Sequence, residues 1–319
     1  MNKLLEKFPN IKTDYNLADL TTFKIGGPAK YFLEISNLKE LQEVVKFCKQ
    51  SSIDFKIIGG GSNLLVNDNG FDGLIIKLNN KNIELLDDGI FKVDAGVVLL
   101  NFVNFSLEKG FTGQEFLAGI PGTVGGAIYG NAGAYGQDMG SIVIQVQVLN
   151  QNNEFVWIEK KDCVFEYRQS IFKDSQHIIL QAQISLTQEN IQVSQELIQQ
   201  RILQRAQGHP LNMPNAGSWF KNIDLTNELK VRIEKLANSE EMRRFEKYQK
   251  IPAAFLIEQA GLKGYQIGGA QMSEKHANFL INAGQATAED IINLSDYVKE
   301  KIKDKYGIEL EEEVQYIGF

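Results

Sequence analysis

The pattern of apolar and polar residues predicts short strands in the first part of the chain and helices in the last. Residues 38–48 carry apolar side chains at helical spacing, and residues 55–58 form an apolar run that ends in three glycines. These patterns predict an amphipathic helix followed by a short buried strand. Six further alternating or apolar runs predict strands at residues 64–66, 74–78, 91–95, 142–149, 155–158 and 178–184. Many short strands with few helices favour an α+β fold.

Helical spacing returns near residue 190. Residues 190–206 place apolar side chains at helical intervals, and Gly208 and Pro210 then stop the helix. Between residues 223 and 250, 13 of 28 residues are charged with both signs mixed, which is typical of a solvent-exposed helical excursion. We therefore place the main domain boundary near residue 190 and expect no chemistry from the charged stretch.

Charge and hydropathy limit the classes of partner. The 33 Lys and Arg residues against 40 Asp and Glu residues give a net charge of −7, which disfavours nucleic acids and anionic membranes as partners. The first nine residues lack the apolar core of a secretory signal, and no apolar run approaches the roughly 18 residues of a membrane span. We therefore expect a cytoplasmic protein that binds neither nucleic acid nor membranes.

Side chains that commonly bind metals are few and scattered. Cys48 and Cys163 are too few for a disulfide framework, lack metal-ligand spacing, and are interpreted as free thiols. His177, His209 and His276 lie outside any H-E-x-x-H motif and have no clustered acidic partners. The sequence therefore predicts no metal site.

Glycine is concentrated in one region, where 17 of the 28 glycines fall between Gly59 and Gly140. The first cluster, Gly-Gly-Gly-Ser-Asn at residues 59–63, directly follows a predicted strand, where backbone N–H groups can converge on an anion. It does not fit the G-x-G-x-x-G motif of a Rossmann fold, because Leu64 stands at the third glycine position. The chain contains no Gly-Lys dipeptide, which excludes a P-loop.

A second glycine-rich segment, residues 116–136, is longer and contains no charged residue. Its small residues allow ligand atoms to approach the backbone closely. Tight turns between strands explain either segment alone as well as ligand binding does. The two together, without a Lys or Arg clamp, favour a diphosphate held mainly by backbone amides, as in a bound dinucleotide.

Ordered motifs extend over nearly the whole chain. The most specific are Tyr-Arg-Gln-Ser-Ile-Phe, Gly-Ser-Trp-Phe-Lys-Asn and Leu-Glu-Glu-Glu-Val. All the motif segments, in order, lie at residues 22–29, 59–65, 116–135, 167–172, 217–222, 261–279 and 310–314. On these residues the chain resembles the UDP-N-acetylenolpyruvoylglucosamine reductases, bacterial flavoenzymes. The Ser-Glu-Lys-His-Ala-Asn form at residues 273–278, without a long extra loop before the helix predicted at residues 190–206, resembles the shorter subtype of that family.

The resemblance implies a fold and a cofactor. The implied fold is an FAD-binding domain of the vanillyl-alcohol-oxidase type with two α+β subdomains, residues 1–75 and 76–190, followed by an α+β substrate-binding domain, residues 191–319, with the charged insertion at 223–250. It implies noncovalent FAD, since neither glycine-rich segment contains a His or Cys for attachment, and NADPH as the hydride donor. The implied FAD contacts are Gly59, Gly60, Gly61, Ser62, Asn63, Leu64, Gly119, Ile120, Pro121, Gly122, Thr123, Gly125, Gly126, Ala127, Asn131, Gly133 and Ala134.

The reaction that the resemblance implies is reduction of an enolpyruvyl ether to a lactyl ether, which gives UDP-N-acetylmuramate for peptidoglycan synthesis and so serves cell wall biogenesis, cell shape and cell division. Hydride addition at the β-carbon leaves negative charge at the α-carbon and its carboxylate, and one proton must follow. The matching residues are Arg168 to bind the carboxylate, Ser218 to donate the proton, and Glu313, in its protonated form, to share the charge. Without the motifs, each residue has a structural explanation: Arg168 as part of an ion pair, Ser218 as a turn residue, and Glu313 as a solvated acid.

Strand geometry distinguishes between the two acidic residues next to Glu313. If residues 310–314 form a strand, Glu311 and Glu313 share one face and Glu312 lies on the other, which makes Glu312 the weakest candidate. For the sugar or diphosphate, the substrate-binding candidates are Tyr167, Lys221, Asn222 and His276. A helix-surface position explains His276 equally well.

The chain departs from the family's pattern at one place. Ile223 stands where the family has a proline, and residues 223–250 look longer than the usual connection. The family's motif returns intact from Ile251, so we interpret the stretch as an insertion that leaves activity in place.

Two other functions remain open at this point, namely another FAD-dependent oxidoreductase on the same fold and a nucleotide-binding protein without catalysis. The expected partner is a small-molecule UDP-sugar. A monomer is compatible with the sequence, which determines neither the oligomeric state nor a preference for NADPH over NADH.

Overall fold

The computed structural model describes residues 3–319, which form two compact units built from segments far apart in the sequence. Unit 1 contains the described residues up to Asn16 together with Pro28–Gly61 and Phe71–Arg205. Unit 2 contains Leu17–Gly27, Ser62–Gly70 and Ala206–Phe319. The boundaries predicted after residues 75 and 190 do not coincide with these breaks and stay a prediction about domains.

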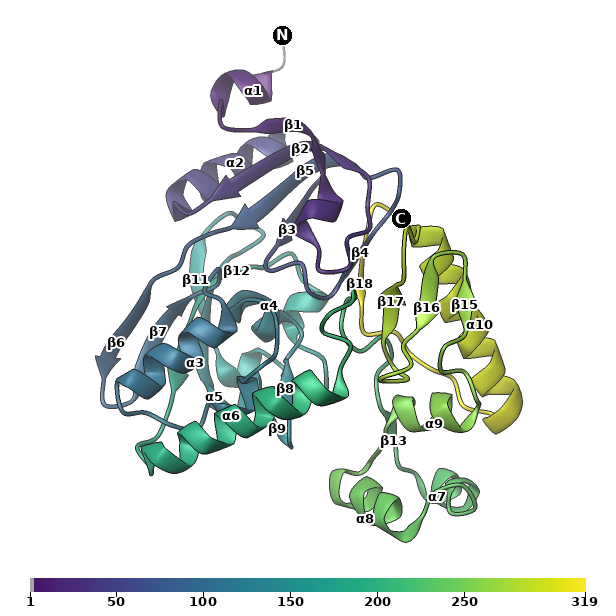
Figure 1. The fold of residues 1–319 in the computed structure, drawn as a ribbon. Helices are drawn as coiled ribbons and strands as arrows, with labels where there is room; N and C mark the ends of the chain where they lie inside the picture. Colours follow the sequence, from purple (N-terminus) through teal and green to yellow (C-terminus); the bar gives the residue numbers. More distant parts are fainter. Residues whose placement is uncertain (1–2) are drawn as a thin grey trace. The chain divides into compact units, whose positions relative to one another are not determined.

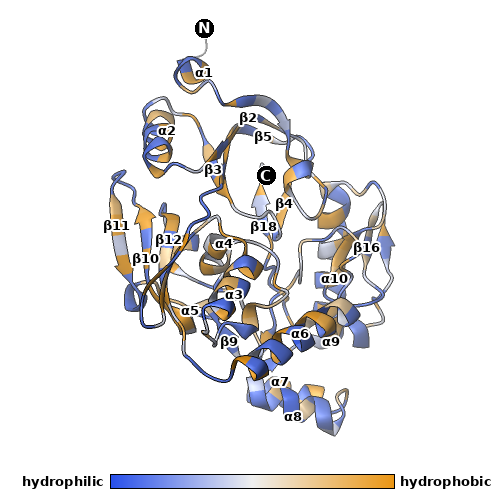
Figure 2. Ribbon diagram, turned by 60° about the vertical axis from the view of Figure 1, so that its left-hand side comes forward, coloured by the Kyte–Doolittle hydropathy of each residue, from blue (hydrophilic) through white to orange (hydrophobic). Residues whose placement is uncertain are grey.

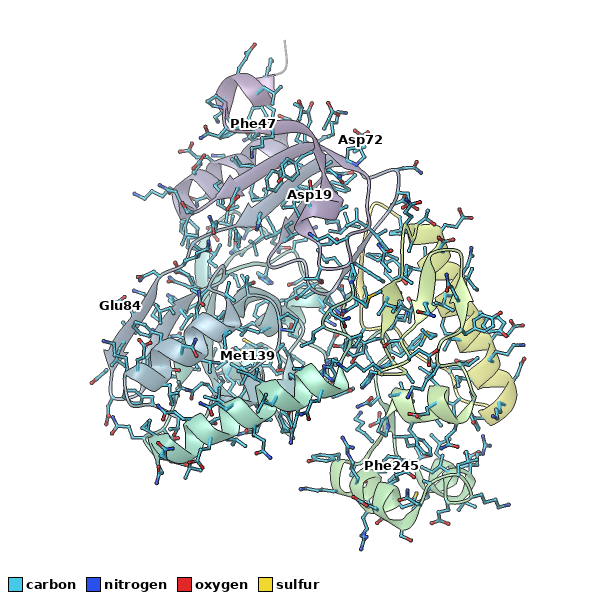
Figure 3. All side chains as sticks on the ribbon, in the orientation of Figure 1. Asp19, Phe47, Asp72, Glu84, Met139 and Phe245 are labelled. Atoms are coloured by element: carbon cyan, nitrogen blue, oxygen red, sulfur yellow. The ribbon has the colours of Figure 1, made fainter. Side chains whose placement is uncertain are left out.

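The first sheet of unit 1 is mixed. Its strands, in the order β1-β2-β5-β3, are β1 (Lys12–Asn16), β2 (Pro28–Ile35), β5 (Phe71–Leu78) and β3 (Phe55–Ile58). The β1–β2 pair is antiparallel, whereas β5 pairs parallel with both β2 and β3. Helix α2 (Leu38–Gln50) connects β2 to β3, and the side chain of Asn37 caps it by accepting from Lys39 N and Glu40 N. Short helix α1 (Lys3–Lys7) adds Leu4 to the same core, where Phe8 packs edge-on against Phe47. Phe47 is labelled in Figure 3.

The second sheet of unit 1 is antiparallel throughout. Its strands, in spatial order, are β11 (Phe155–Glu159), β10 (Val143–Leu149), β12 (Ile178–Ser185), β7 (Ile90–Asp94) and β6 (Ile83–Asp87). Four helices lie on one side of it (Figures 1 and 2), namely α3 (Leu99–Glu108), α4 (Val124–Tyr129), α5 (Met139–Ile142) and α6 (Ile191–Gly208). Their apolar faces and both sheets share one continuous core, since a helix and a sheet each bury one face against the other.

Short elements connect the larger ones. They are η1 (Leu17–Leu20) in unit 2 and, in unit 1, η2 (Glu115–Leu117), η3 (Lys160–Asp162), η4 (Ile171–Lys173) and the hairpin β8 (Gly133–Ala134) with β9 (Gln137–Asp138). In residues 3–319 no helix is both long and apolar enough to cross a membrane.

Unit 2 has a small sheet covered by a long helix (Figure 1). The antiparallel strands are β15 (Gln266–Ile267), β16 (Ala270–Met272) and β17 (Leu280–Asn282), and the helices are α9 (Ala253–Gln259) and α10 (Ala288–Tyr306). Thr287 and Asp290 form a capping box at the start of α10, and Gly307 ends it in the left-handed conformation. Strand β4 (Leu64–Val66) pairs parallel with β18 (Gln315–Ile317), although some 250 residues separate them.

The charged stretch forms a helical lobe on unit 2, as its composition predicted. Strands β13 (Ile223–Asp224) and β14 (Lys250–Ile251) pair at its base. Helices α7 (Asn227–Ile233) and α8 (Ser239–Tyr248) lie between these strands in the sequence and form the rest of the lobe (Figure 1). Phe245, labelled in Figure 3, packs against Phe255 of α9 with ring centroids 5.1 Å apart. The lobe is therefore joined to the core of unit 2 through apolar contacts as well as through its strands.

The structure confirms the helices predicted at residues 38–48 and 190–206, the second observed as α6 (Ile191–Gly208), and every strand predicted from alternating or apolar runs. The condition set for the strand geometry at residues 310–314 is not met, because only Glu312 makes a bridge, to Phe220, and the strand begins at Gln315. The glycine-rich segment at 116–136 is not all loop, because Thr123 caps helix α4 by accepting from Gly126 N.

Candidate functional site

The two glycine-rich segments meet within unit 1. A Cβ added to Gly59 would lie 2.5 Å from Thr123 Oγ1, and one added to Gly60 would lie 2.9 Å from Gly122 Cα. Only residues without a side chain permit backbones to approach this closely. The sequence predicted each segment separately, and the structure brings their first halves into contact.

The second half of the first segment belongs to unit 2. Residues 59–61 lie in unit 1 and residues 62–64 in unit 2. Asn63 donates from Nδ2 to Ala216 O at 3.2 Å, and its own carbonyl accepts from Gln315 N at 3.0 Å. The implied FAD-binding segment therefore leads directly to the two segments that hold Ser218 and Glu313.

The second segment is held rigid by its own side chains and by close packing. Gly119 and Gly122 have φ of +74° and +117°, a region that favours glycine. A Cβ on Gly125 would lie 2.8 Å from Ala95 Cβ. Buried Asn131 donates to Asp138 Oδ2 and Glu166 O and accepts from Gly140 N, so its side chain shapes the loop. The remaining predicted contacts, all in unit 1, are Ile120, Pro121, Thr123, Gly126, Ala127, Gly133 and Ala134.

Arg168 is brought to the second segment. Its Nη2 donates to Gly133 O at 3.0 Å, and its guanidinium lies 5.2 Å from the ring centroid of Tyr167. The backbone of Arg168 has φ +57°, and its carbonyl accepts from Lys173 Nζ at 2.7 Å. The motif at residues 167–172 thus uses a turn with a left-handed residue to direct this arginine onto the glycine-rich segment.

Two arginines that the sequence interpretation missed lie beside the same segment. Arg201 and Arg205 are four residues apart on α6, so they share one helix face. The guanidinium of Arg201 stacks 4.5 Å from the ring centroid of Tyr135, and a Cβ on Gly119 would lie 2.7 Å from Arg205 Cδ. Within residues 3–319, Arg201 Nη1 and Arg205 Nε are buried without a hydrogen-bond partner. The glycine-rich segments contain no Lys or Arg of their own, but α6 places two arginines beside the second segment.

Burial lowers the pKa of both guanidinium groups. For Arg201 the nearby Glu115 and Tyr135 oppose this effect, and for Arg205 the neighbouring Arg168 and Arg201 add to it while Tyr135 opposes it. A buried cation with an unsatisfied N–H is costly unless an anion or acceptor joins it. The i, i+4 spacing of the two arginines is visible in the sequence. Their orientation toward the protein interior is not visible there.

The segments that follow Ser218 and that contain Glu313 are paired through their backbones in unit 2. Glu313 N donates to Trp219 O and Lys221 N donates to Glu311 O, each at 2.8 Å. Phe220 and Glu312 form the bridge between these bonds. Two motifs nearly one hundred residues apart are thereby placed side by side.

Asn278 fixes the segment that follows Ser218. Its carbonyl accepts from Trp219 N at 2.8 Å, its Oδ1 accepts from Phe220 N at 2.9 Å, and its Nδ2 donates to Phe220 O at 2.8 Å. Asn278 is buried. These three bonds explain why the Ser-Glu-Lys-His-Ala-Asn motif accompanies the serine motif: its asparagine satisfies backbone groups that would otherwise be buried unpaired.

His276 lies in the loop between β16 and β17, so the helix-surface alternative was wrong. Its Nδ1 accepts from Asn278 N at 3.2 Å, and its ring packs edge-on against His209 and Phe279. Burial, and then the charge of Lys263, lower the pKa of His276, while Glu258 opposes this. The bond at Nδ1 selects the neutral tautomer with its proton on Nε2.

The other substrate-binding candidates contact neighbouring residues or remain partly exposed. Lys221 forms an ion pair with Glu311, whose side chain is 73% exposed. Asn222 accepts at Oδ1 from Ala253 N at 3.3 Å. Tyr167 remains 37% exposed beside Arg168.

Neither cysteine takes part in a site. Both are buried free thiols, and burial raises the pKa of Cys48 to about 11 and that of Cys163 to about 12. Among residues 3–319, no group of three or more His, Cys, Asp and Glu side chains is arranged to hold a metal ion.

Comparison with known proteins agrees with this arrangement. Residues 209–317 match the family model of the UDP-N-acetylenolpyruvoylglucosamine reductase C-terminal domain, and residues 29–159 match that of an FAD binding domain. The UDP-N-acetylenolpyruvoylglucosamine reductase of Anoxybacillus flavithermus is 38% identical over 310 residues, covering 97% of this chain and 94% of that protein. The protein of the same name from Bacillus subtilis is 37% identical and covers 95% of this chain and 92% of its own.

A solved structure also matches over nearly the full length. The UDP-N-acetylenolpyruvylglucosamine reductase of Thermus caldophilus superimposes with a TM-score of 0.75 at 27% identity, covering 96% of this chain and 98% of that one. The match confirms the expected α+β fold with an FAD-binding domain. The chain belongs to the UDP-N-acetylenolpyruvoylglucosamine reductase family.

Proposed function

We propose that this protein is an NADPH-dependent flavoenzyme that reduces the enolpyruvyl ether of UDP-N-acetylglucosamine-enolpyruvate to the lactyl ether, with Arg168, Ser218 and Glu313 acting on the reacting group. The observation that supports this best is the position of Asn63. It bonds to Ala216 O and Gln315 N, so an implied FAD-binding residue joins the segments of Ser218 and Glu313.

The residues present fit FAD. Gly59 and Gly60 pack directly against Gly122 and Thr123 with no room for a Cβ, and this backbone contact is the cradle to which we assign FAD binding. The buried, unsatisfied N–H groups of Arg201 and Arg205 suit a cofactor with many acceptor atoms. When bound, FAD supplies the hydride chemistry, delivering to the substrate the hydride that NADPH provides. Residues 59–64 and the implied contacts between 119 and 134 would hold it without a covalent bond.

Arg168 is proposed to bind the substrate carboxylate. A guanidinium can engage a carboxylate through two parallel N–H bonds, and this is where charge accumulates after hydride reaches the β-carbon. The bond to Gly133 O restricts the side chain before substrate arrives. Less orientational entropy is then lost in the transition state.

Ser218 is proposed to protonate the α-carbon, and Glu313 to stabilise the developing charge. Together, hydride at the β-carbon and a proton at the α-carbon reduce the double bond and complete the product. A hydroxyl is a weak acid, but a carbanion stabilised only by its carboxylate is a strong base, so a well-placed serine suffices. Glu313 would act as a hydrogen-bond donor to the substrate carboxylate.

The sugar diphosphate is proposed to bind to Tyr167, Lys221, Asn222 and His276. The ion pair of Lys221 with exposed Glu311 is worth little, so its ammonium can exchange to a phosphate oxygen. Neutral His276 would offer its Nε2–H as a donor, since its Nδ1 already accepts from Asn278 N.

The Ser218→Ala variant tests the assignment. We expect NADPH to reduce the bound flavin at the wild-type rate, while reoxidation by the enolpyruvyl substrate slows by about 10²-fold or more, the usual effect of losing a general acid. Stopped-flow measurement of the two half-reactions separates them, with Ser239→Ala on the exposed lobe as the control. If both half-reactions of Ser218→Ala proceed unchanged, the proton-donor role is wrong.

We also propose a cytoplasmic location, because the reaction consumes NADPH and a nucleotide sugar. Activity recovered only in the membrane fraction of a cell lysate would contradict it.

A further inference from the structure

Glu312 is a half-buried carboxylate to which the proposed reaction gives no role. Its side chain is 19% exposed and accepts from Ser295 Oγ at 2.5 Å, Tyr316 Oη at 2.5 Å and Lys299 Nζ at 2.9 Å. Burial alone would raise the pKa of Glu312, but the bonds from these three residues outweigh burial and lower it. The carboxylate is therefore ionised and held in one geometry.

The bonds of Glu312 extend to the segment of Ser218. Ser295 Oγ also accepts from Trp219 Nε1 at 2.8 Å, and Trp219 is fully buried. A continuous chain of hydrogen bonds thus runs from Trp219 through Ser295 to Glu312. All of it lies within unit 2.

The two ends of this chain adjoin the proposed catalytic residues. Trp219 immediately follows Ser218, and Glu312 immediately precedes Glu313. The backbone of the same residues is paired, because Glu313 N donates to Trp219 O. A movement of the Glu312 carboxylate would therefore shift the peptides on which both catalytic side chains stand.

The anchor for this chain is helix α10. It contributes Ser295 and Lys299, four residues apart on one face, and Lys299 is held in turn by Asp296 at 2.6 Å. Ser295 is buried. Charge-assisted bonds to a rigid helix are short and directional, and they fix a loop more firmly than exposed pairs do.

We propose that Glu312 is a positioning residue, which holds the segments of Ser218 and Glu313 against α10 through Ser295 and Trp219. This inference rests on the proposed function of Ser218 and Glu313. It also gives a role to Glu312, which strand alternation made the weakest catalytic candidate among Glu311, Glu312 and Glu313.

The first test is Glu312→Gln in the FAD-loaded protein. The amide keeps the volume but places a donor where the carboxylate accepts from three donors. We expect reoxidation of the reduced flavin by substrate to slow by about tenfold or more, since small displacements of reacting groups are costly, and flavin reduction by NADPH to stay unchanged. Glu309→Gln is the matched control, because Glu309 is 78% exposed and pairs with Lys303 on the same C-terminal segment.

A double variant separates positioning from loss of structure. If Glu312 acts through Ser218, then Glu312→Gln adds little to the loss already caused by Ser218→Ala, because residues that act as one unit are not additive. Ser295→Ala should reproduce the selective loss, and Ser295→Thr, which keeps the hydroxyl, should restore most of the rate. Ser295→Ala also tests the inference if Glu312→Gln does not fold.

Three outcomes would overturn the inference: equal slowing of both half-reactions, no slowing of either, or losses that add fully to that of Ser218→Ala. Failure of the proposed function gives a different result. If Ser218→Ala leaves reoxidation intact while Glu312→Gln slows it, the proton-donor role of Ser218 is wrong and the positioning of Glu313 by Glu312 stands.

Discussion

The amide N–H of Glu313 donates to the carbonyl oxygen of Trp219 at 2.8 Å, which places the proposed acid beside the residue that follows Ser218. Neither segment is a regular strand at this point, and Glu312 makes only an isolated bridge to Phe220. Side-chain hydrogen bonds hold these two short irregular segments instead. The Asn278 side chain bonds to Phe220, and the Glu312 side chain bonds to Ser295. Precise placement of catalytic groups commonly depends on such supporting bonds.

Gly60→Ala should weaken FAD binding. The added Cβ would lie 2.9 Å from Gly122 Cα, and because that neighbour is backbone, the two glycine-rich segments must move apart. We expect the dissociation constant for FAD to rise by about tenfold, or about 1.4 kcal/mol, measured by titrating FAD into the apoprotein. Gly208→Ala is the control, because nothing lies within 4 Å of its Cβ. Equal affinities for both variants would contradict the cradle.

Arg201→Met should reveal a balance between stability and ligand binding. The substitution keeps an apolar chain against Tyr135 but removes a buried cation whose Nη1 has no partner within the described residues. Replacing a poorly satisfied buried charge with an apolar group of similar size is often neutral or stabilising. We expect the melting temperature of the FAD-free protein not to fall, and its FAD affinity to decrease.

Differential scanning calorimetry and FAD titration check these two effects separately. Arg244→Met, on the exposed lobe, is the control for the loss of a positive charge. A lower melting temperature together with unchanged FAD affinity would show that Arg201 serves only the packing of unit 1.

Removing the charged lobe should lower stability and leave turnover in place. Strands β13 and β14 already pair Asp224 with Lys250, so an Asn-Gly turn can replace residues 225–249. The deletion uncovers Phe255, which loses its contact with Phe245, and we expect a loss of about 1–3 kcal/mol in the free energy of unfolding. Urea unfolding and steady-state turnover measure the two effects. A deletion variant that is stable but inactive would place the lobe in the catalytic cycle.

His276 should make stability fall as the pH drops. Burial lowers the pKa of His276 in the folded protein, so the unfolded chain, with a pKa of about 6.5, binds the proton first. Its contribution is therefore complete above about pH 6.5 and is lost as the pH falls through the folded pKa. The faces around the ring carry Lys263, which adds to the effect, Glu258, which opposes it, and His209.

The measurement compares urea unfolding of the wild type and His276→Gln from pH 8 to pH 5. The difference between the two should shrink on acidification. His177, whose pKa burial also lowers, is present in both proteins and cancels in that difference. A difference that stays constant with pH would show that His276 is protonated equally in both states.

The sequence by itself determined the local elements. Alternating or apolar runs predicted β3, β4, β5, β7, β10, β11 and β12, but not β1, β2 or β6, and helical spacing predicted α2 and α6. Ordered motifs identified the family and the candidate residues, and the mixed charges of residues 223–250 indicated an exposed helical lobe. Each of these signals is contained within one short stretch of chain.

Only the tertiary structure decided which distant segments meet. The contact of Gly59 and Gly60 with Gly122 and Thr123 depends on two backbones approaching closely, which glycine permits but does not specify. The inward orientation of Arg201 depends on which face of α6 the core covers, and α6 is only weakly amphipathic in sequence. Glu312 turns toward Ser295 and Lys299 because α10 offers donors there, a relationship between segments that no local pattern encodes.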